Sequence, residues 1–89
     1  MSEDGPKNPV REAILSLVEA RGAGKTICPT EAAREVSEDK WRRALQDVRA
    51  EAVRLAKAGD IAIYRKGKPV DPDSFKGVYR LGLPGKGGG

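Results

Sequence analysis

The first apolar pattern in the chain follows Asn8 and Pro9, a pair typical of a helix start. Asn caps free backbone N–H groups there, and Pro at the first helical position loses no hydrogen bond. Apolar side chains then recur at spacings that place them on one helix face: Val10, Ile14, Leu17 and Val18. Because Gly22 is a typical residue after a helix end, the sequence predicts a helix from Pro9 to Arg21.

A short strand and a second helix are predicted next. The stretch from Lys25 to Cys28 is too short for a helix but suits a strand, and Pro29 ends it because proline cannot donate a ladder hydrogen bond. Pro29 also suits the start of a second helix. Small apolar residues on one face continue that helix to about Val36: Ala32, Ala33 and Val36.

The third and longest helix is predicted after Ser37, which is followed by Glu38 and Asp39. A capping hydroxyl with acidic residues in the first turn is a helix start signal. Apolar residues spaced by four and three positions form one stripe: Trp41, Leu45, Val48, Ala52 and Leu55. The stripe predicts one continuous helix to about Ala58, with a break near Gln46 as the alternative because aspartate follows it.

Two stretches rich in β-branched and aromatic residues, 61–66 and 78–81, predict the strands of a β-hairpin. The connection between them, residues 67–77, contains prolines, aspartates and glycines, and it predicts an irregular loop that we call the wing. Helix, strand, helix, helix, strand, wing, strand is the order of a winged helix-turn-helix domain.

The predicted fold class is therefore α+β, a winged helix-turn-helix with three helices, a short strand and a C-terminal β-hairpin wing. The domain is predicted to span residues 8–83. Residues 1–7 are predicted to form a flexible N-terminus, and the glycine-rich residues 84–89 a disordered tail, because they offer few side chains to bury.

Composition favours binding over catalysis. The chain has 17 Lys and Arg, 13 Asp and Glu and no His, for a net charge of +4. Without His and with a single cysteine, Cys28, the common zinc, Ser-His and Cys-His sites are unavailable. No apolar run approaches a membrane span, and the N-terminus lacks the order of a signal peptide. The expectation is a cytoplasmic protein that is not an enzyme, with no cofactor, no metal and no membrane partner.

Positive charge is concentrated in the last third of the chain. From residue 61 onward there are six basic and two acidic residues, whereas the two signs balance before it. A local positive field of this kind favours a phosphate-bearing partner. On the third helix, the side opposite the Trp41 stripe is also basic, with Asp47 and Glu51 expected at its margin.

These charges predict duplex DNA binding by the third helix and the wing. The residues expected to reach base edges lie on the helix: Arg42, Arg43, Gln46 and Arg49. Those expected to contact the DNA backbone extend along the helix and over the hairpin: Arg54, Lys57, Arg65, Lys66, Lys68 and Lys76. The protein is expected to act as a monomer or a homodimer.

A different reading assigns the same charges to solubility, with Glu51 or Asp47 pairing with Arg54 or Arg43 at helical spacing. A second alternative is a protein-interaction module without nucleic-acid binding, whose basic wing docks on an acidic protein surface. Winged helices support both roles, so the fold alone does not decide between them.

Three features that suggest a ligand-binding or reactive site also have structural explanations. Gly22 to Thr26 resembles part of a phosphate-binding loop, but the required first glycine falls at Glu19 and a helix precedes the stretch. Cys28 lies just before a helix start, where a thiol pKa is lowered, yet a lone cysteine beside Ile27 is typical of a small core residue or a cap. Trp41, on the apolar stripe, is expected to anchor the core.

Several segments together resemble a bacterial family known only as a domain of unknown function, number 3253. They are Gly24 to Glu31, Trp41-Arg42 with Asp47-Val48-Arg49, Leu55-Ala56 to Gly59-Asp60-Ile61, Lys66 to Pro72, and Gly77 to Leu81. The resemblance implies a small winged-helix-like protein of the bacterial cytoplasm. It supplies no activity, ligand or functional residue, and the family's frequent proline near Gln46 is missing here.

Overall fold

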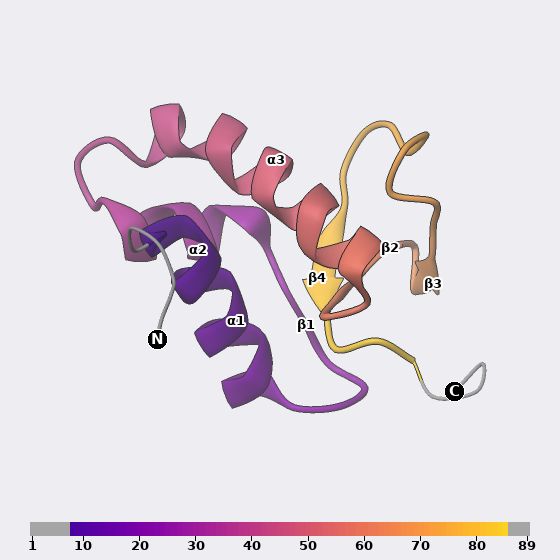
Figure 1. The fold of residues 1–89 in the computed structure, drawn as a ribbon. Coiled ribbons are helices and arrows are strands. Elements are labelled where there is room, and N and C mark those ends of the chain that lie inside the picture. Colours follow the sequence, from indigo (N-terminus) through magenta and orange to yellow (C-terminus); the bar gives the residue numbers. More distant parts are fainter. Residues whose placement is uncertain (1–7, 86–89) are drawn as a thin grey trace.

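The computed structural model describes residues 8–85, which form three helices and a small antiparallel sheet (Figure 1). Helix α1 spans Pro9–Arg21 and helix α2 spans Pro29–Val36, both as predicted. Helix α3 runs without interruption over Trp41–Ala58, so the alternative of a break near Gln46 is wrong. These elements confirm the α+β class and are compatible with a winged helix.

The predicted capping is found at the start of α1 and at the end of α3. The Asn8 side chain accepts a hydrogen bond from the Arg11 backbone N–H at 3.1 Å. Gly59 ends α3 in the left-handed region, at φ 87°, which glycine adopts without steric cost. The Glu31 carboxylate accepts from the Cys28 N–H at 3.4 Å, across the start of α2.

Four strands pair in the order β1-β4-β2-β3. Strand β1 (Thr26–Ile27) pairs with β4 (Arg80–Gly82), which also pairs with β2 (Ala62–Arg65). Because β1 lies between the first two helices in sequence, this pairing ties the helical part of the domain to the C-terminal hairpin.

The predicted wing was wrong in one respect, since part of it is a strand. Strand β3 (Lys68–Pro69) folds back on β2 through a two-residue turn at Lys66 and Gly67. Both turn residues have positive φ, 53° and 81°, as a tight hairpin turn that follows the strand twist requires. We call residues 66–79, which join β2 to β4, the wing segment.

Two predicted boundaries also differ. Helix α3 begins at Trp41, not directly after Ser37, because the Ser37 hydroxyl accepts from the Lys40 N–H at 3.0 Å and closes a separate turn before the helix. Strand β4 begins at Arg80, so Val78 and Tyr79 lie in the wing segment. The predicted flexible residues 1–7, and residues 86–89 of the predicted tail, lie outside the described residues.

The core lies between the helices and the sheet, and all three helices contribute to it. Its largest fully buried side chains come from both parts of the fold: Ile14, Val18, Ile27, Val48, Leu55, Ile61, Ile63 and Leu81. Trp41 is only half-buried at the edge of this core, with the guanidinium groups of Arg34 and Arg42 over its ring at 4.8 and 5.1 Å. It is therefore a peripheral member of the core.

No helix in residues 8–85 is long and apolar enough to cross a membrane.

Candidate nucleic-acid interface

The N-terminal half of α3 exposes three of the predicted base-contacting residues: Arg42, Arg43 and Gln46. Each has an exposed side chain, and neither arginine forms an ion pair with another residue in the described part of the chain. Their donor groups are therefore available to a partner. Asp47 is exposed beside them and is the acidic residue of this half of the helix.

Arg49, one turn further along α3, is held by the wing segment. Its Nη2 donates to the Phe75 carbonyl at 3.3 Å, and its Cζ lies 4.1 Å from the centre of the Phe75 ring. The centre of the Tyr79 ring lies 5.8 Å from the same Arg49 Cζ. The Tyr79 ring also packs edge-to-face against the Phe75 ring, with centroids 5.1 Å apart. This contact fixes the wing segment against α3.

Arg65 makes a second such contact from the end of β2. Its Nε donates to the Val78 carbonyl at 2.8 Å. Gly77 has φ 82°, and a Cβ there would lie 3.0 Å from the Arg65 guanidinium. Arg49 and Arg65 thus bind successive parts of one loop, and their positive groups are partly used within the protein.

The two cations predicted further along α3 are ion-paired. Lys57 Nζ lies 2.7 Å from Asp73 Oδ1 of the wing segment, which adds a second contact between that segment and α3. Arg54 Nη1 lies 2.5 Å from Glu51 Oε1. The Arg54–Glu51 pair is one of those expected from the helical spacing.

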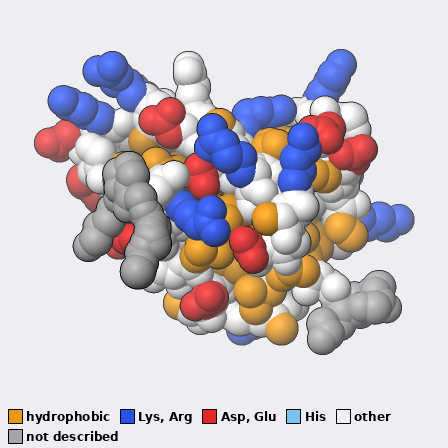
Figure 2. All heavy atoms as spheres, viewed as in Figure 1, with side chains coloured by type: hydrophobic (Ala, Val, Ile, Leu, Met, Phe, Trp, Pro, Cys, Tyr) orange, Lys and Arg blue, Asp and Glu red, His pale blue; other side chains and the backbone are white. Residues whose placement is uncertain are grey.

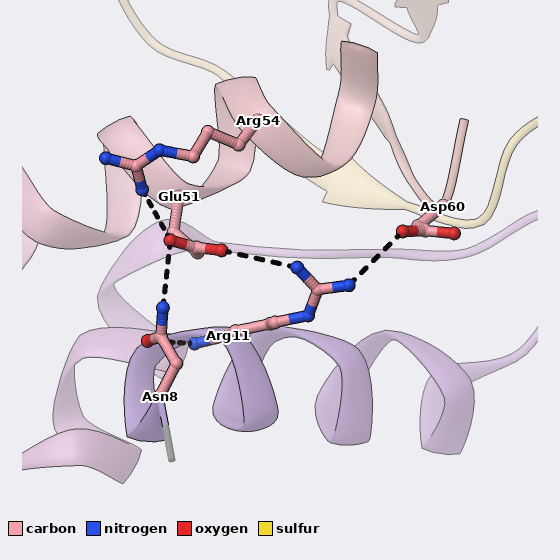
Figure 3. Close-up of polar contacts among 5 residues, drawn as sticks. All are labelled: Asn8, Arg11, Glu51, Arg54 and Asp60. Atoms are coloured by element: carbon pink, nitrogen blue, oxygen red, sulfur yellow. Dashed lines mark hydrogen bonds and ion pairs between the residues drawn. The ribbon is translucent and has the colours of Figure 1, made fainter. Parts of the chain in front are cut away.

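Glu51 is buried, whereas the sequence analysis placed it at the margin of the basic side of the third helix. Its side chain is 5% exposed and accepts from the Asn8 amide at 3.1 Å, while Arg11 approaches at 3.8 Å and also pairs with Asp60 at 3.7 Å (Figure 3). These four residues, together with Arg54, form a polar cluster that joins α1 to α3. Arg54 is therefore directed toward α1 and away from the wing segment.

The remaining predicted cations lie on the wing segment itself. Lys66, Lys68 and Lys76 are exposed and form no ion pair within residues 8–85. Figure 2 shows Lys and Arg side chains along the upper edge of the molecule, over α3 and the wing segment, with acidic side chains between them. The structure thus gives one face a mixed but mainly basic rim.

An apolar groove with a volume of about 620 Å³ lies between these basic groups. It is bounded by the start of α2, by α3 and by the end of the wing segment, and Pro29, Leu45, Gln46, Val78 and Tyr79 line it. Sequence analysis missed this groove because its walls come from three separate segments. It also missed Phe75, which is 6% exposed although it lies in a loop.

The family model described as Protein of unknown function (DUF3253) matches residues 7–84. This chain belongs to that family. No curated protein is significantly similar to it. In this DUF3253 member, the stretch that resembles a phosphate-binding loop is a turn that leads into β1, and the Lys25 N–H donates to the Gly22 carbonyl at 3.3 Å.

Tyr79 gives the DUF3253 chain a testable response to pH. Burial raises the pKa of Tyr79, the positive charge of Arg49 lowers it in part, and Cys28 adds to the increase. Since the folded state favours the neutral phenol, this group contributes full stability below the unfolded-state pKa of about 10. That contribution is lost as pH rises above that value.

We therefore expect the unfolding free energy to fall less steeply between about pH 9.5 and 11 in Tyr79→Phe than in the wild type. Urea denaturation at a series of pH values measures this difference. Lysine titration affects both proteins alike, so it cancels in the comparison. Parallel pH profiles for the two proteins would contradict the raised pKa.

Proposed function

We propose that the domain is a winged helix that binds duplex DNA, with α3 in the major groove and the wing segment on the DNA backbone. The observation that carries the proposal is the exposed set Arg42, Arg43 and Gln46 on α3, beside a wing segment held in place by Arg49. Arginine and glutamine are the side chains that read guanine and adenine edges in the major groove.

The contacts of the basic residues within the domain indicate a different role for each group. We assign base reading to Arg42, Arg43 and Gln46, and phosphate contacts to Lys66, Lys68 and Lys76. Arg49 and Arg65 act as positioning residues, because each donates to a wing-segment carbonyl. Arg54 and Lys57 have acidic partners within the domain, so they add less to the positive field.

The test is the salt dependence of binding to a labelled mixed-sequence duplex, followed by fluorescence anisotropy. Each phosphate contact that is lost lowers the slope of log affinity against log salt by about 0.9. We expect Lys68→Ser to lower the slope by this amount. Lys25→Ser is the matched control: Lys25 is also exposed and free of ion pairs in the described chain, but it lies in the turn between α1 and β1.

Equal slopes for Lys68→Ser and Lys25→Ser would overturn the wing contact. An absence of binding by the wild type at low salt would overturn the proposed function as a whole. The same basic face would then be assigned to an acidic protein partner, which a pull-down with the wild type and an Arg42/Arg43 double-Glu variant would address.

A further inference from the structure

The apolar groove lies where the proposed function requires contact with DNA. Its lining includes Leu45, Gln46 and Arg49 from α3, and Val78 and Tyr79 from the wing segment. Gln46 and Arg49 belong to the predicted base-contacting set. Lys76 directly precedes Gly77, which also lines the groove. A basic surface of this kind favours a polyanion that carries an apolar group.

Val78 is the most informative residue of this groove. It is 83% exposed, and no other large hydrophobic residue is exposed in residues 8–85. Its exposure is fixed by the fold, because its own carbonyl accepts from Arg65 and the preceding Gly77 packs under that guanidinium. An apolar side chain held in water gains free energy when a partner's apolar group covers it.

In duplex DNA, the apolar group displayed in the major groove is the methyl group on C5 of thymine. The same position carries a methyl group in 5-methylcytosine. We infer that the groove formed by Leu45, Val78 and Tyr79 binds the C5-methyl group of a pyrimidine in the major groove. This inference rests on the proposed function, since it places the DNA on the same face.

An apolar protein segment with acidic residues is the competing occupant of this groove. DNA is favoured by Gln46, Arg42 and Arg43, whose exposed hydrogen-bonding groups lie on the same half of α3. A base pair offers a methyl group and hydrogen-bonding atoms side by side on one edge. The groove and its polar neighbours match that arrangement.

The test compares hairpin DNA stems that differ only in this methyl group. One pair is an alternating A·T stem of about two helical turns and the same stem with uracil in place of thymine. The other pair is an alternating G·C stem with cytosine or with 5-methylcytosine. Uracil keeps every hydrogen-bonding atom of thymine, so a difference in affinity reports the methyl group itself.

We expect the wild type to bind each methylated stem about fourfold more tightly for each methyl group buried, which corresponds to ~0.8 kcal/mol. Val78→Ser is expected to abolish both differences, so that the variant binds the two stems of each pair with equal affinity. The A·T and G·C pairs separate thymine from 5-methylcytosine as the source of the methyl group.

Equal binding within both pairs of stems, or a methyl preference that Val78→Ser retains, would overturn this inference while the proposed function stands. Failure to bind any stem at low salt would overturn both. Because Val78 is exposed, its substitution is not expected to unfold the domain, and circular dichroism of the variant checks this.

Discussion

Phe75→Ala is expected to destabilise the domain by about 3–5 kcal/mol, the typical cost of deleting a buried aromatic ring. Phe75 is 6% exposed and supports both Tyr79, at 5.1 Å between ring centroids, and the Arg49 guanidinium, at 4.1 Å from its own ring. Its removal leaves a cavity and takes away the ring through which the wing segment contacts Arg49 of α3. Urea denaturation followed by circular dichroism measures the loss.

A domain of this size has a total stability of about 5–15 kcal/mol, so Phe75→Ala takes a large part of it. Phe75→Leu keeps an apolar side chain at the site and is expected to lose less. Val78→Ala is the matched control in the same segment, because Val78 is 83% exposed and its truncation is expected to cost about 0.5 kcal/mol or less. Similar losses for Phe75→Ala and Val78→Ala would show that the wing segment does not contribute to the core.

Glu51→Ala is expected to lower the unfolding free energy by about 2–3 kcal/mol. The buried Glu51 carboxylate accepts from Asn8 and faces both Arg11 and Arg54, and hydrogen bonds to charged groups are worth about 1.5–3 kcal/mol each. Breaking a fully buried ion pair costs about 3–5 kcal/mol, but both arginines here can turn toward water, since they are 48% and 67% exposed.

Thermal unfolding provides the measurement, since a loss of 1 kcal/mol shifts Tm by about 4–8 °C in a domain of this size. Glu35→Ala removes the same charge from the exposed surface of α2 and is expected to change stability by about 0.5 kcal/mol or less. Glu51→Gln keeps an acceptor for the Asn8 amide and should lie between the two. If Glu51→Ala is as stable as Glu35→Ala, the cluster makes no net contribution.

The proposed site was predicted only in part from the sequence. All of the predicted base-contacting residues lie on α3, but Arg49 donates to the wing segment through the Phe75 carbonyl. Helical periodicity fixes which side of α3 a residue occupies, and it carries no information about what packs there. Arg65 is the same case, because its acceptor, the Val78 carbonyl, is 13 residues away in sequence.

Local sequence determined the three helices and the approximate positions of β2 and β4. Asn8-Pro9, Pro29 and Gly59 act within one turn of the chain, so the capping and breaking that they cause can be read from neighbouring residues. The tight turn at Lys66 and Gly67 is also local, and its positive φ values explain why β3 follows so closely.

Only the tertiary structure decided the burial of Phe75 and Glu51 and the existence of the apolar groove. Phe75 is buried because Arg49 and Tyr79 lie against it. Glu51 is buried because the start of α1 brings Asn8 to it from a separation of 43 residues, together with Arg11. Burial depends on which distant segments meet, whereas periodicity reports only the face of one element. The sequence thus determined the elements and the excess positive charge, and tertiary packing decided which charged groups are bonded within the domain.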